Sequence, residues 1–124
     1  MTGGKTIVVV DDEPDMVFFL RGILQDHGYN VLSAPNGRAG IEKIVESKPD
    51  LVFMDVIMPV VQGNDALHYL RSRPELKETK IVLMSSLTPK EFDRTAAERG
   101  QADEYLLKPL STRHVLETVG KLLA

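Results

Sequence analysis

The segment DLVFMDVIMP, residues 50–59, places an acid directly after four apolar residues. The run Leu51–Met54 is apolar at every position, which is typical of a strand covered on both faces of a sheet. Asp55 follows at once, and the chain then stays apolar up to Pro59. The segment therefore raises the question of why a carboxylate should end what is predicted to be a buried strand.

Apolar runs and amphipathic stretches alternate along the rest of the chain. Besides 51–54, strands are predicted at 6–10, 29–34, 81–84 and 105–107. The helices are predicted from their start signals, which are Pro14 in a first turn, the capping residues Asn36 and Ser111, Asn64, and a capping box with proline at 88–91. Gly28 is expected to end the first helix in the left-handed conformation. Five strands and five helices in alternation predict an α/β fold, in which right-handed crossovers place helices on both faces of a parallel sheet.

Length and composition are those of a single globular domain. The 124 residues are near the commonest domain size, and the net charge of −3 gives no general attraction to nucleic acid or anionic membranes. The chain has no cysteine, which excludes disulfides, thiolate zinc sites and a cysteine nucleophile. No apolar run approaches the roughly 20 residues that span a bilayer, and the first residues are not typical of a secretion signal. We therefore expect a cytoplasmic protein that binds neither nucleic acid nor membrane.

Polar side chains follow four of the five predicted strands. They are Asp11 and Asp12 after the first strand, Asp55 after the third, Ser85 and Ser86 after the fourth, and Lys108 after the fifth. The carboxyl ends of parallel strands share one edge of a sheet, which is where such folds bind ligands. The second strand contributes nothing comparable, so we expect it at the side of the sheet. Asp55 is thus predicted to belong to a cluster drawn from four strands.

The three carboxylates of this cluster would repel each other, so the site requires a cation. Lys108 supplies one positive charge. Oxygen ligands without histidine or cysteine favour Mg²⁺, which typically takes one or two carboxylates together with phosphate oxygens. A hydroxyl and an ammonium beside Mg²⁺ would hold a phosphoryl group. Asp55 is then a candidate nucleophile, because carboxylates can form aspartyl phosphates.

The motifs that carry these residues resemble those of two-component response-regulator receiver domains, in particular stand-alone, chemotaxis-regulator-like ones. They are IVVVDDEP (7–14), LVFMDVIMP (51–59), IVLMSS (81–86) and YLLKP (105–109), and they span essentially the whole chain in the family's order. The resemblance implies a flavodoxin-like doubly wound (βα)5 fold with strand order 2-1-3-4-5. It also implies that residues 1–124 form one receiver domain, and we expect no output domain in this chain.

The resemblance further implies a role for each residue of the cluster. Asp55 would be the phosphoacceptor. Asp11 and Asp12 would hold Mg²⁺ together with Asp55, and the backbone carbonyl of Ile57 would complete the protein ligands. Lys108 would pair with the phosphoryl group.

A second set of residues would respond to phosphorylation. Ser85 takes the place of the family's switch hydroxyl and Tyr105 that of its switch aromatic, and the bond from Lys108 to Pro109 is expected to be cis. Ser86 remains an alternative to Ser85, because its distance from Lys108 fits the family's spacing, whereas the four apolar residues before Ser85 favour Ser85. Tyr105 could also be only a half-buried strand residue.

The implied function is a phosphorylation-switched signalling protein rather than an enzyme with a separate substrate. A histidine kinase or phosphotransfer protein would phosphorylate Asp55. The surface of the fourth helix, fifth strand and fifth helix would then change and be read by a downstream protein target, with the chain a monomer or a weak dimer. Two alternatives are a Mg²⁺-dependent aspartyl-phosphate phosphohydrolase and a degenerate receiver that binds its partner constitutively. The first usually needs an acid two residues after the nucleophile, where this chain has Ile57, and the intact acids and Lys108 argue against the second.

Overall fold

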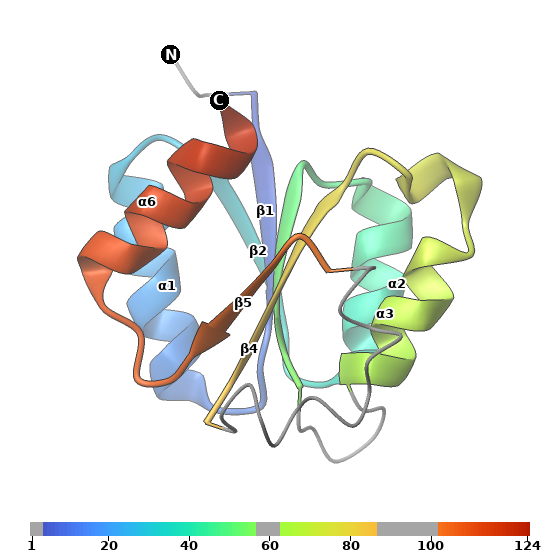
Figure 1. Ribbon diagram of the computed structural model, residues 1–124, viewed down its shortest axis with the longest axis horizontal. Helices are drawn as coiled ribbons and strands as arrows, with labels where there is room; N and C mark the ends of the chain where they lie inside the picture. Colours follow the sequence, from blue (N-terminus) through green and yellow to red (C-terminus); the bar gives the residue numbers. More distant parts are fainter. Residues whose placement is uncertain (1–3, 57–62, 87–101) are drawn as a thin grey trace.

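The computed structural model describes residues 4–56, 63–86 and 102–124, and these residues form one parallel sheet with helices on both faces (Figure 1). The five strands have the order β2-β1-β3-β4-β5, and all neighbouring pairs are parallel. Their bounds are β1 Thr6–Val10, β2 Asn30–Ala34, β3 Leu51–Asp55, β4 Lys80–Ser85 and β5 Glu104–Leu107. The predicted strand order is confirmed, and β2 lies at one side of the sheet as expected.

The helices lie on the two faces in pairs, with α1 and α6 on one face and α2 and α3 on the other (Figure 1). Their bounds are α1 Pro14–Asp26, α2 Gly37–Ser47, α3 Gly63–Arg71 and α6 Thr112–Leu123. A short 3₁₀ helix, η1 Pro74–Leu76, precedes β4 and was not predicted. The helix predicted to begin at the 88–91 capping box lies outside the described residues. The arrangement is the doubly wound fold that the alternation of strands and helices predicts.

Local capping signals act where the sequence predicts them. The Asn36 side chain accepts a hydrogen bond from the Ala39 N–H at 2.9 Å, and the Ser111 hydroxyl accepts one from the His114 N–H at 3.1 Å. Gly28 follows α1 with φ of 87°, a conformation that glycine adopts without strain. These helix ends are therefore set by residues adjacent in sequence.

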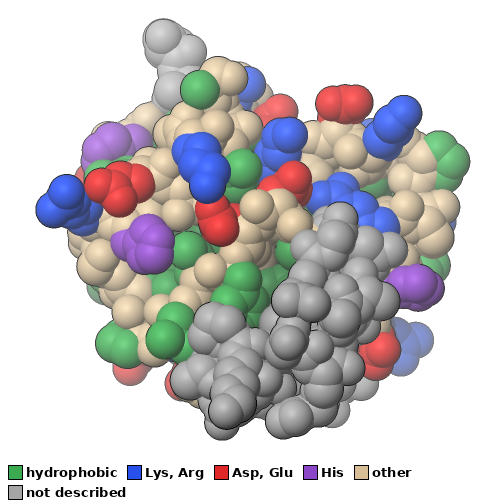
Figure 2. Space-filling model, in the orientation of Figure 1, with side chains coloured by type: hydrophobic (Ala, Val, Ile, Leu, Met, Phe, Trp, Pro, Cys, Tyr) green, Lys and Arg blue, Asp and Glu red, His purple; other side chains and the backbone are tan. Residues whose placement is uncertain are grey.

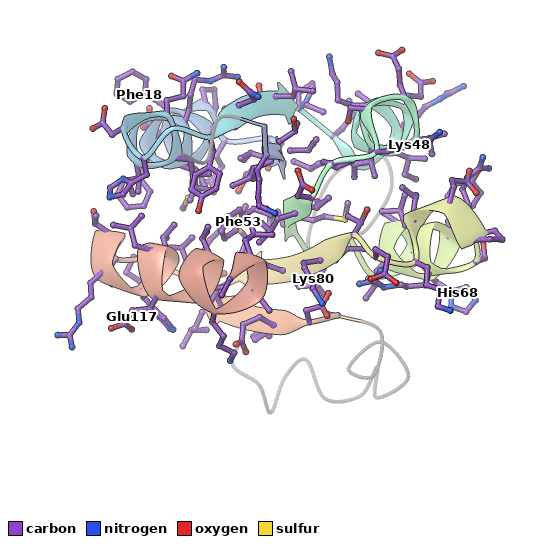
Figure 3. The ribbon with its side chains drawn as sticks, turned by 90° about the horizontal axis from the view of Figure 1, so that it is seen from above. Phe18, Lys48, Phe53, His68, Lys80 and Glu117 are labelled. Carbon is purple, nitrogen blue, oxygen red and sulfur yellow. The ribbon has the colours of Figure 1, made fainter. Side chains whose placement is uncertain are left out.

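Alternate residues of each central strand enter two separate cores, because successive side chains of a strand point to opposite faces. Val8 and Val52 pack with α2 and α3, whereas Val9 and Phe53 pack with α1 and α6. Phe53 is fully buried and lies between α1 and α6 (Figure 3). Coverage on both faces explains why the central strands are apolar at every position.

Helix α2 lies unusually close to β1 at Gly40. A Cβ atom placed on Gly40 would lie 2.7 Å from both γ carbons of Val10, which is closer than carbon atoms approach one another. Val10 is the last residue of β1, directly before Asp11. The small residue at 40 therefore fixes the separation between α2 and the strand that carries the first acid of the cluster.

The surface carries charged residues of both signs, which are interspersed on the face shown in Figure 2. Large exposed apolar side chains among the described residues are Phe18, Tyr69 and Leu107. Phe18 points away from the core on α1 (Figure 3). Within the described ranges, none of the helices has the length and apolar character needed to cross a bilayer.

Candidate functional site

Four strands deliver the polar residues of the predicted cluster to one edge of the sheet. Backbone hydrogen bonds continue past the strand ends and tie this edge together. The Asp11 N–H donates to the Ala34 carbonyl at 3.1 Å, and the Lys108 N–H donates to the Ser85 carbonyl at 2.8 Å. The residues that follow the strands are thereby held in the register of the sheet, and Asp55 itself is the last residue of β3.

Three carboxylates meet at this edge, as the sequence predicts. Asp11, Asp12 and Asp55 each offer one oxygen atom, and these atoms all lie within 4.8 Å of one another. Asp11 and Asp55 are buried, whereas Asp12 is exposed. Buried carboxylates are costly unless a cation or hydrogen-bond donors accompany them, so the partners of these acids decide what the site can do.

Lys108 is the cation that the protein places among the acids. Its Nζ atom lies 3.0 Å from Asp11 Oδ2, 3.5 Å from Asp55 Oδ2 and 3.0 Å from Glu13 Oε1. Burial by itself would lower the pKa of Lys108, but the hydrogen bonds to Asp11 and Glu13 and the charge of Asp55 outweigh burial and raise it. Lys108 is therefore a stable ammonium at neutral pH, held beside the proposed nucleophile.

Glu13 is the residue of the site that the sequence pattern did not identify. Glu13 is the residue before Pro14, at the start of α1. Its side chain reaches Lys108, which lies 95 residues away in the chain. One sequence feature pointed to a role for Glu13 in the site, namely its position directly after Asp12 at the same edge of the sheet. Acidic residues are common at helix starts, so this position alone did not distinguish a site residue from an ordinary residue of a helix start.

Two of the three clustered carboxylates, together with Glu13, the Lys108 ammonium and two hydroxyls, line one cavity of about 410 Å³. Its lining residues are Asp12, Glu13, Asp55, Ser85, Ser86 and Lys108. Ser85 is 2% exposed as the last residue of β4, and Ser86 follows it as an exposed residue. Both candidate switch hydroxyls are thus at the cavity, so its lining leaves the choice between them open.

Three further predictions concern residues that do not line this cavity in the described part of the chain. Tyr105 is half-buried on β5 and packs against the core on the α2 and α3 face. The Lys108–Pro109 peptide bond is cis, as the family resemblance implies. Ile57, whose backbone carbonyl is predicted to bind Mg²⁺, lies outside the described residues.

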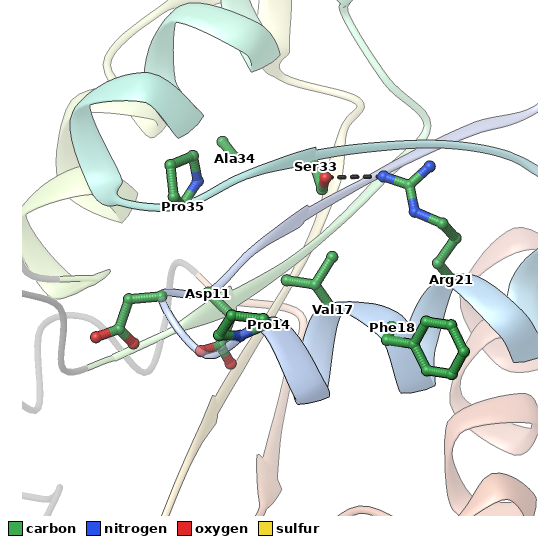
Figure 4. Close-up of a pocket in the computed structure, with 9 residues that line it drawn as sticks. Asp11, Pro14, Val17, Phe18, Arg21, Ser33, Ala34 and Pro35 are labelled. Atoms are coloured by element: carbon green, nitrogen blue, oxygen red, sulfur yellow. Dashed lines mark hydrogen bonds between the residues drawn. The ribbon is translucent and has the colours of Figure 1, made fainter.

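A second hollow of about 360 Å³ adjoins the cavity and shares Asp12 with it. Pro14, Val17 and Phe18 of α1 face the end of β2 across this hollow (Figure 4). The Arg21 guanidinium donates to the Ser33 hydroxyl at 2.8 Å and closes its far end (Figure 4). Phe18 is 80% exposed, so this hollow offers apolar surface next to the acids.

The donor set fits a hard divalent cation. It consists of carboxylate oxygens, with neither a histidine nor a cysteine in the cluster, and its negative charge exceeds the single charge of Lys108. Oxygen-only sites of this kind suit Mg²⁺ better than zinc or copper. The open cavity beside the acids leaves room for water or phosphate oxygens to complete the coordination.

This fold and site define a class of protein, and comparison with known proteins identifies it. The family model of the response regulator receiver domain matches residues 7–120, and the chain belongs to that family. The chain is 33% identical to the protein PilH of Pseudomonas aeruginosa over 95% of its own length and 97% of PilH. It is 34% identical to the chemotaxis protein CheY of Thermotoga maritima, with 96% and 98% of the two chains covered.

Solved structures agree with this assignment. The structure of the response regulator TrrA from Thermotoga maritima, in complex with Mg²⁺-BeF, superimposes with a TM-score of 0.84 at 33% identity, covering 95% of this chain and 98% of that one. The present chain is therefore a receiver domain of the kind found in two-component signalling proteins.

Proposed function

We propose that this receiver domain accepts a phosphoryl group from a phosphohistidine onto Asp55, and that the phosphorylated form is the signal. The observation that carries the proposal is the convergence of Asp11, Asp12, Asp55 and Lys108 at one edge of the sheet, next to a cavity that Asp55 and Lys108 line. A transferring phosphoryl group is anionic and needs positive charge on its oxygens. Lys108 Nζ, 3.5 Å from Asp55 Oδ2, supplies such charge beside the nucleophile.

The proposed reaction is a displacement at phosphorus. A carboxylate oxygen of Asp55 attacks the phosphorus atom, the oxygen–phosphorus bond forms as the nitrogen–phosphorus bond of the donor breaks, and the donor imidazole leaves with the electron pair. Lys108 donates hydrogen bonds to the phosphoryl oxygens and offsets their charge. Asp11, Asp12 and Asp55, with the backbone carbonyl of Ile57, would hold Mg²⁺, which when bound supplies further charge neutralisation.

The phosphoryl group then changes the balance between two conformations of the protein. The Ser85 hydroxyl donates a hydrogen bond to a phosphoryl oxygen, which draws the end of β4 toward Asp55. Tyr105 moves further inward beside β4, and the surface formed by the fourth helix, β5 and α6 changes. A downstream protein target reads that surface. Phosphorylation would thus bias an existing equilibrium rather than create a new fold.

A protein phosphodonor must cover the surface around the cavity to bring its phosphorus to Asp55. The apolar hollow beside the cavity meets this requirement, because it shares Asp12 with the cavity and presents the 80% exposed ring of Phe18. We place the contact with the histidine kinase or phosphotransfer protein there. A phosphodonor small enough to enter the cavity alone would not need this contact.

The proposal is tested by phosphorylation with a small phosphodonor. The purified protein is incubated with Mg²⁺ and phosphoramidate, and intact mass is measured by mass spectrometry. We expect the wild type to gain one phosphoryl group and Asp55→Asn to gain none. Asp26→Asn, which removes an exposed acid at the end of α1, serves as the matched control and should be phosphorylated like the wild type. Equal phosphorylation of Asp55→Asn and wild type would overturn the proposal.

A further inference from the structure

Lys108 divides its hydrogen bonds between two acids that differ sharply in burial. It donates to Asp11 Oδ2 and to Glu13 Oε1, each at 3.0 Å, while Asp55 Oδ2 is farther away at 3.5 Å. The Asp11 side chain is 0% exposed, whereas that of Glu13 is 64% exposed. Releasing Asp11 would leave a buried charge without its cation, which is costly, but released Glu13 would be solvated by water. Glu13 is therefore the partner from which Lys108 can most easily be released to bind another anion.

The position of Glu13 makes its side chain available for this contact. Glu13 is the N-cap residue of α1, but its side chain forms no capping hydrogen bond. Its backbone N–H donates to Asp11 Oδ1 at 2.9 Å, which holds the residue beside the acid cluster. The backbone is thus anchored to the buried acid, and the side chain, which is not used for capping, lines the cavity and reaches Lys108.

We propose that Glu13 is a positioning residue, which holds the Lys108 ammonium in the unphosphorylated protein and is displaced from it by the phosphoryl group on Asp55. The proposal rests on the proposed function of Asp55 as phosphoacceptor. Glu13 and the phosphoryl oxygens compete for the same N–H groups, so Glu13 sets how strongly the cavity retains a phosphoryl-like anion. The negative charge of Glu13 also increases the attraction of the cavity for a divalent cation.

Loss of the Glu13 charge should change anion binding and Mg²⁺ binding in opposite directions, and this distinguishes the proposed role of Glu13 from a merely structural one. Removing the charge of Glu13 frees Lys108 for an anion on Asp55, so anion binding at saturating Mg²⁺ should tighten by about two- to five-fold, the size expected for an exposed ion pair. The same change removes one negative charge from the cavity, so Mg²⁺ binding should weaken by about two-fold or more. A variant that only damaged the site would weaken both.

The test is isothermal titration calorimetry of the full chain, first with Mg²⁺ and then with beryllofluoride at saturating Mg²⁺. Glu13→Gln should show weaker Mg²⁺ binding and tighter beryllofluoride binding. Glu13→Asp keeps the charge on a side chain too short to reach Lys108, so it should bind Mg²⁺ like the wild type and still bind beryllofluoride more tightly. Asp15→Asn is the control, because it removes an exposed acid from the first turn of the same helix that is not among the ion-pair partners of Lys108 in the described residues.

The outcomes distinguish this inference from the proposed function. If wild type binds beryllofluoride but Glu13→Gln binds both ligands like wild type, or binds both more weakly, Glu13 has no such role and the inference is wrong. If wild type itself does not bind beryllofluoride in the presence of Mg²⁺, the proposed function is what fails. An effect of Asp15→Asn equal to that of Glu13→Gln would show that net helix charge, rather than the contact with Lys108, controls binding.

Discussion

Individual side chains at the site differ in how many neighbours constrain them. Asp55 is paired with Met84 of the neighbouring strand β4. The Lys108 N–H donates to the Ser85 carbonyl of the same strand, and the Lys108 ammonium lies 3.5 Å from Asp55 Oδ2. The two serines after Met84 line the same cavity as these two residues. Ser85 is still paired within the sheet, because its carbonyl accepts the Lys108 N–H, whereas Ser86 lies beyond the end of β4. A hydroxyl that moves the strand when it binds a ligand must belong to the strand, which favours Ser85 as the switch residue.

We predict that Ser85→Ala separates binding of the phosphoryl group from the response to it. The variant keeps Asp55 and Lys108, so it should still bind beryllofluoride in the presence of Mg²⁺. Its affinity for beryllofluoride should be about ten-fold lower than that of the wild type, because one hydrogen bond to a charged group is lost. The change in the NMR signals of the Tyr105 ring on binding should be lost. Ser86→Ala is the matched variant and should keep both. A response that is lost in Ser86→Ala and kept in Ser85→Ala would identify Ser86 as the switch hydroxyl instead.

Gly22 in α1 and Gly40 in α2 both lie inside a helix, and the sequence pattern alone does not distinguish their surroundings. Gly22 in α1 has no atom within 4 Å of an added Cβ, whereas an added Cβ on Gly40 in α2 would lie 2.7 Å from the γ carbons of Val10. Val10 cannot easily turn away, because its β-branched side chain has few allowed rotamers and is fully buried. One glycine is thus an ordinary exposed helix position, and the other is required by the contact between α2 and β1.

We predict opposite effects on stability for the two alanine substitutions. Gly22→Ala should raise the free energy of unfolding by about 0.5–1 kcal/mol, because alanine favours the helix over glycine. Gly40→Ala should lower it by about 1–2 kcal/mol, because overpacking outweighs the same helical preference. Urea denaturation of both variants gives the two values. Stabilisation of both would mean that α2 shifts away from β1 at little cost, and that the close packing is not required.

The molecule as a whole gathers like charges at one edge of its sheet. Two unit charges no more than 4.8 Å apart repel by about 3.5 kcal/mol or more at an effective dielectric constant of ~20. Asp11, Asp12 and Asp55 form three such pairs, and Lys108 offsets them only in part. Folding must overcome this repulsion, which suggests that the site was shaped by its function at some cost in stability.

We predict that the stability of the chain depends on the cation at this edge. In a chelating buffer, Asp55→Asn should unfold at a higher temperature than wild type, by about 4 °C for each kcal/mol of repulsion removed. Mg²⁺ at about 100 times its dissociation constant should stabilise wild type by about 2.7 kcal/mol and the variant by much less. Thermal unfolding followed by circular dichroism, with and without Mg²⁺, measures both effects. Destabilisation of Asp55→Asn in the chelating buffer would contradict the proposed repulsion.

Much of this architecture follows from local sequence. Local signals act over a few neighbouring residues; they are the apolar runs, the capping residues Asn36 and Ser111, and the left-handed Gly28. The alternation of strands and helices was therefore predictable. The positions of Asp55 and Lys108 at strand ends follow from that alternation. The covalent order of the chain places every strand-end residue at the same edge once the sheet is parallel. The convergence of the three acids therefore required no knowledge of side-chain packing.

Contacts between distant elements could not be predicted in this way. The pairing of Glu13 with Lys108, the approach of Gly40 to Val10 and the exposure of Phe18 depend on how far apart two elements lie and how each is turned. These distances are set by the packing of both cores at once, and no local pattern of residues encodes them. The sequence by itself thus determines which groups lie at the strand ends that form the site. The tertiary structure decides which of these groups are in contact, because the distances between side chains depend on how the sheet and the helices pack against each other.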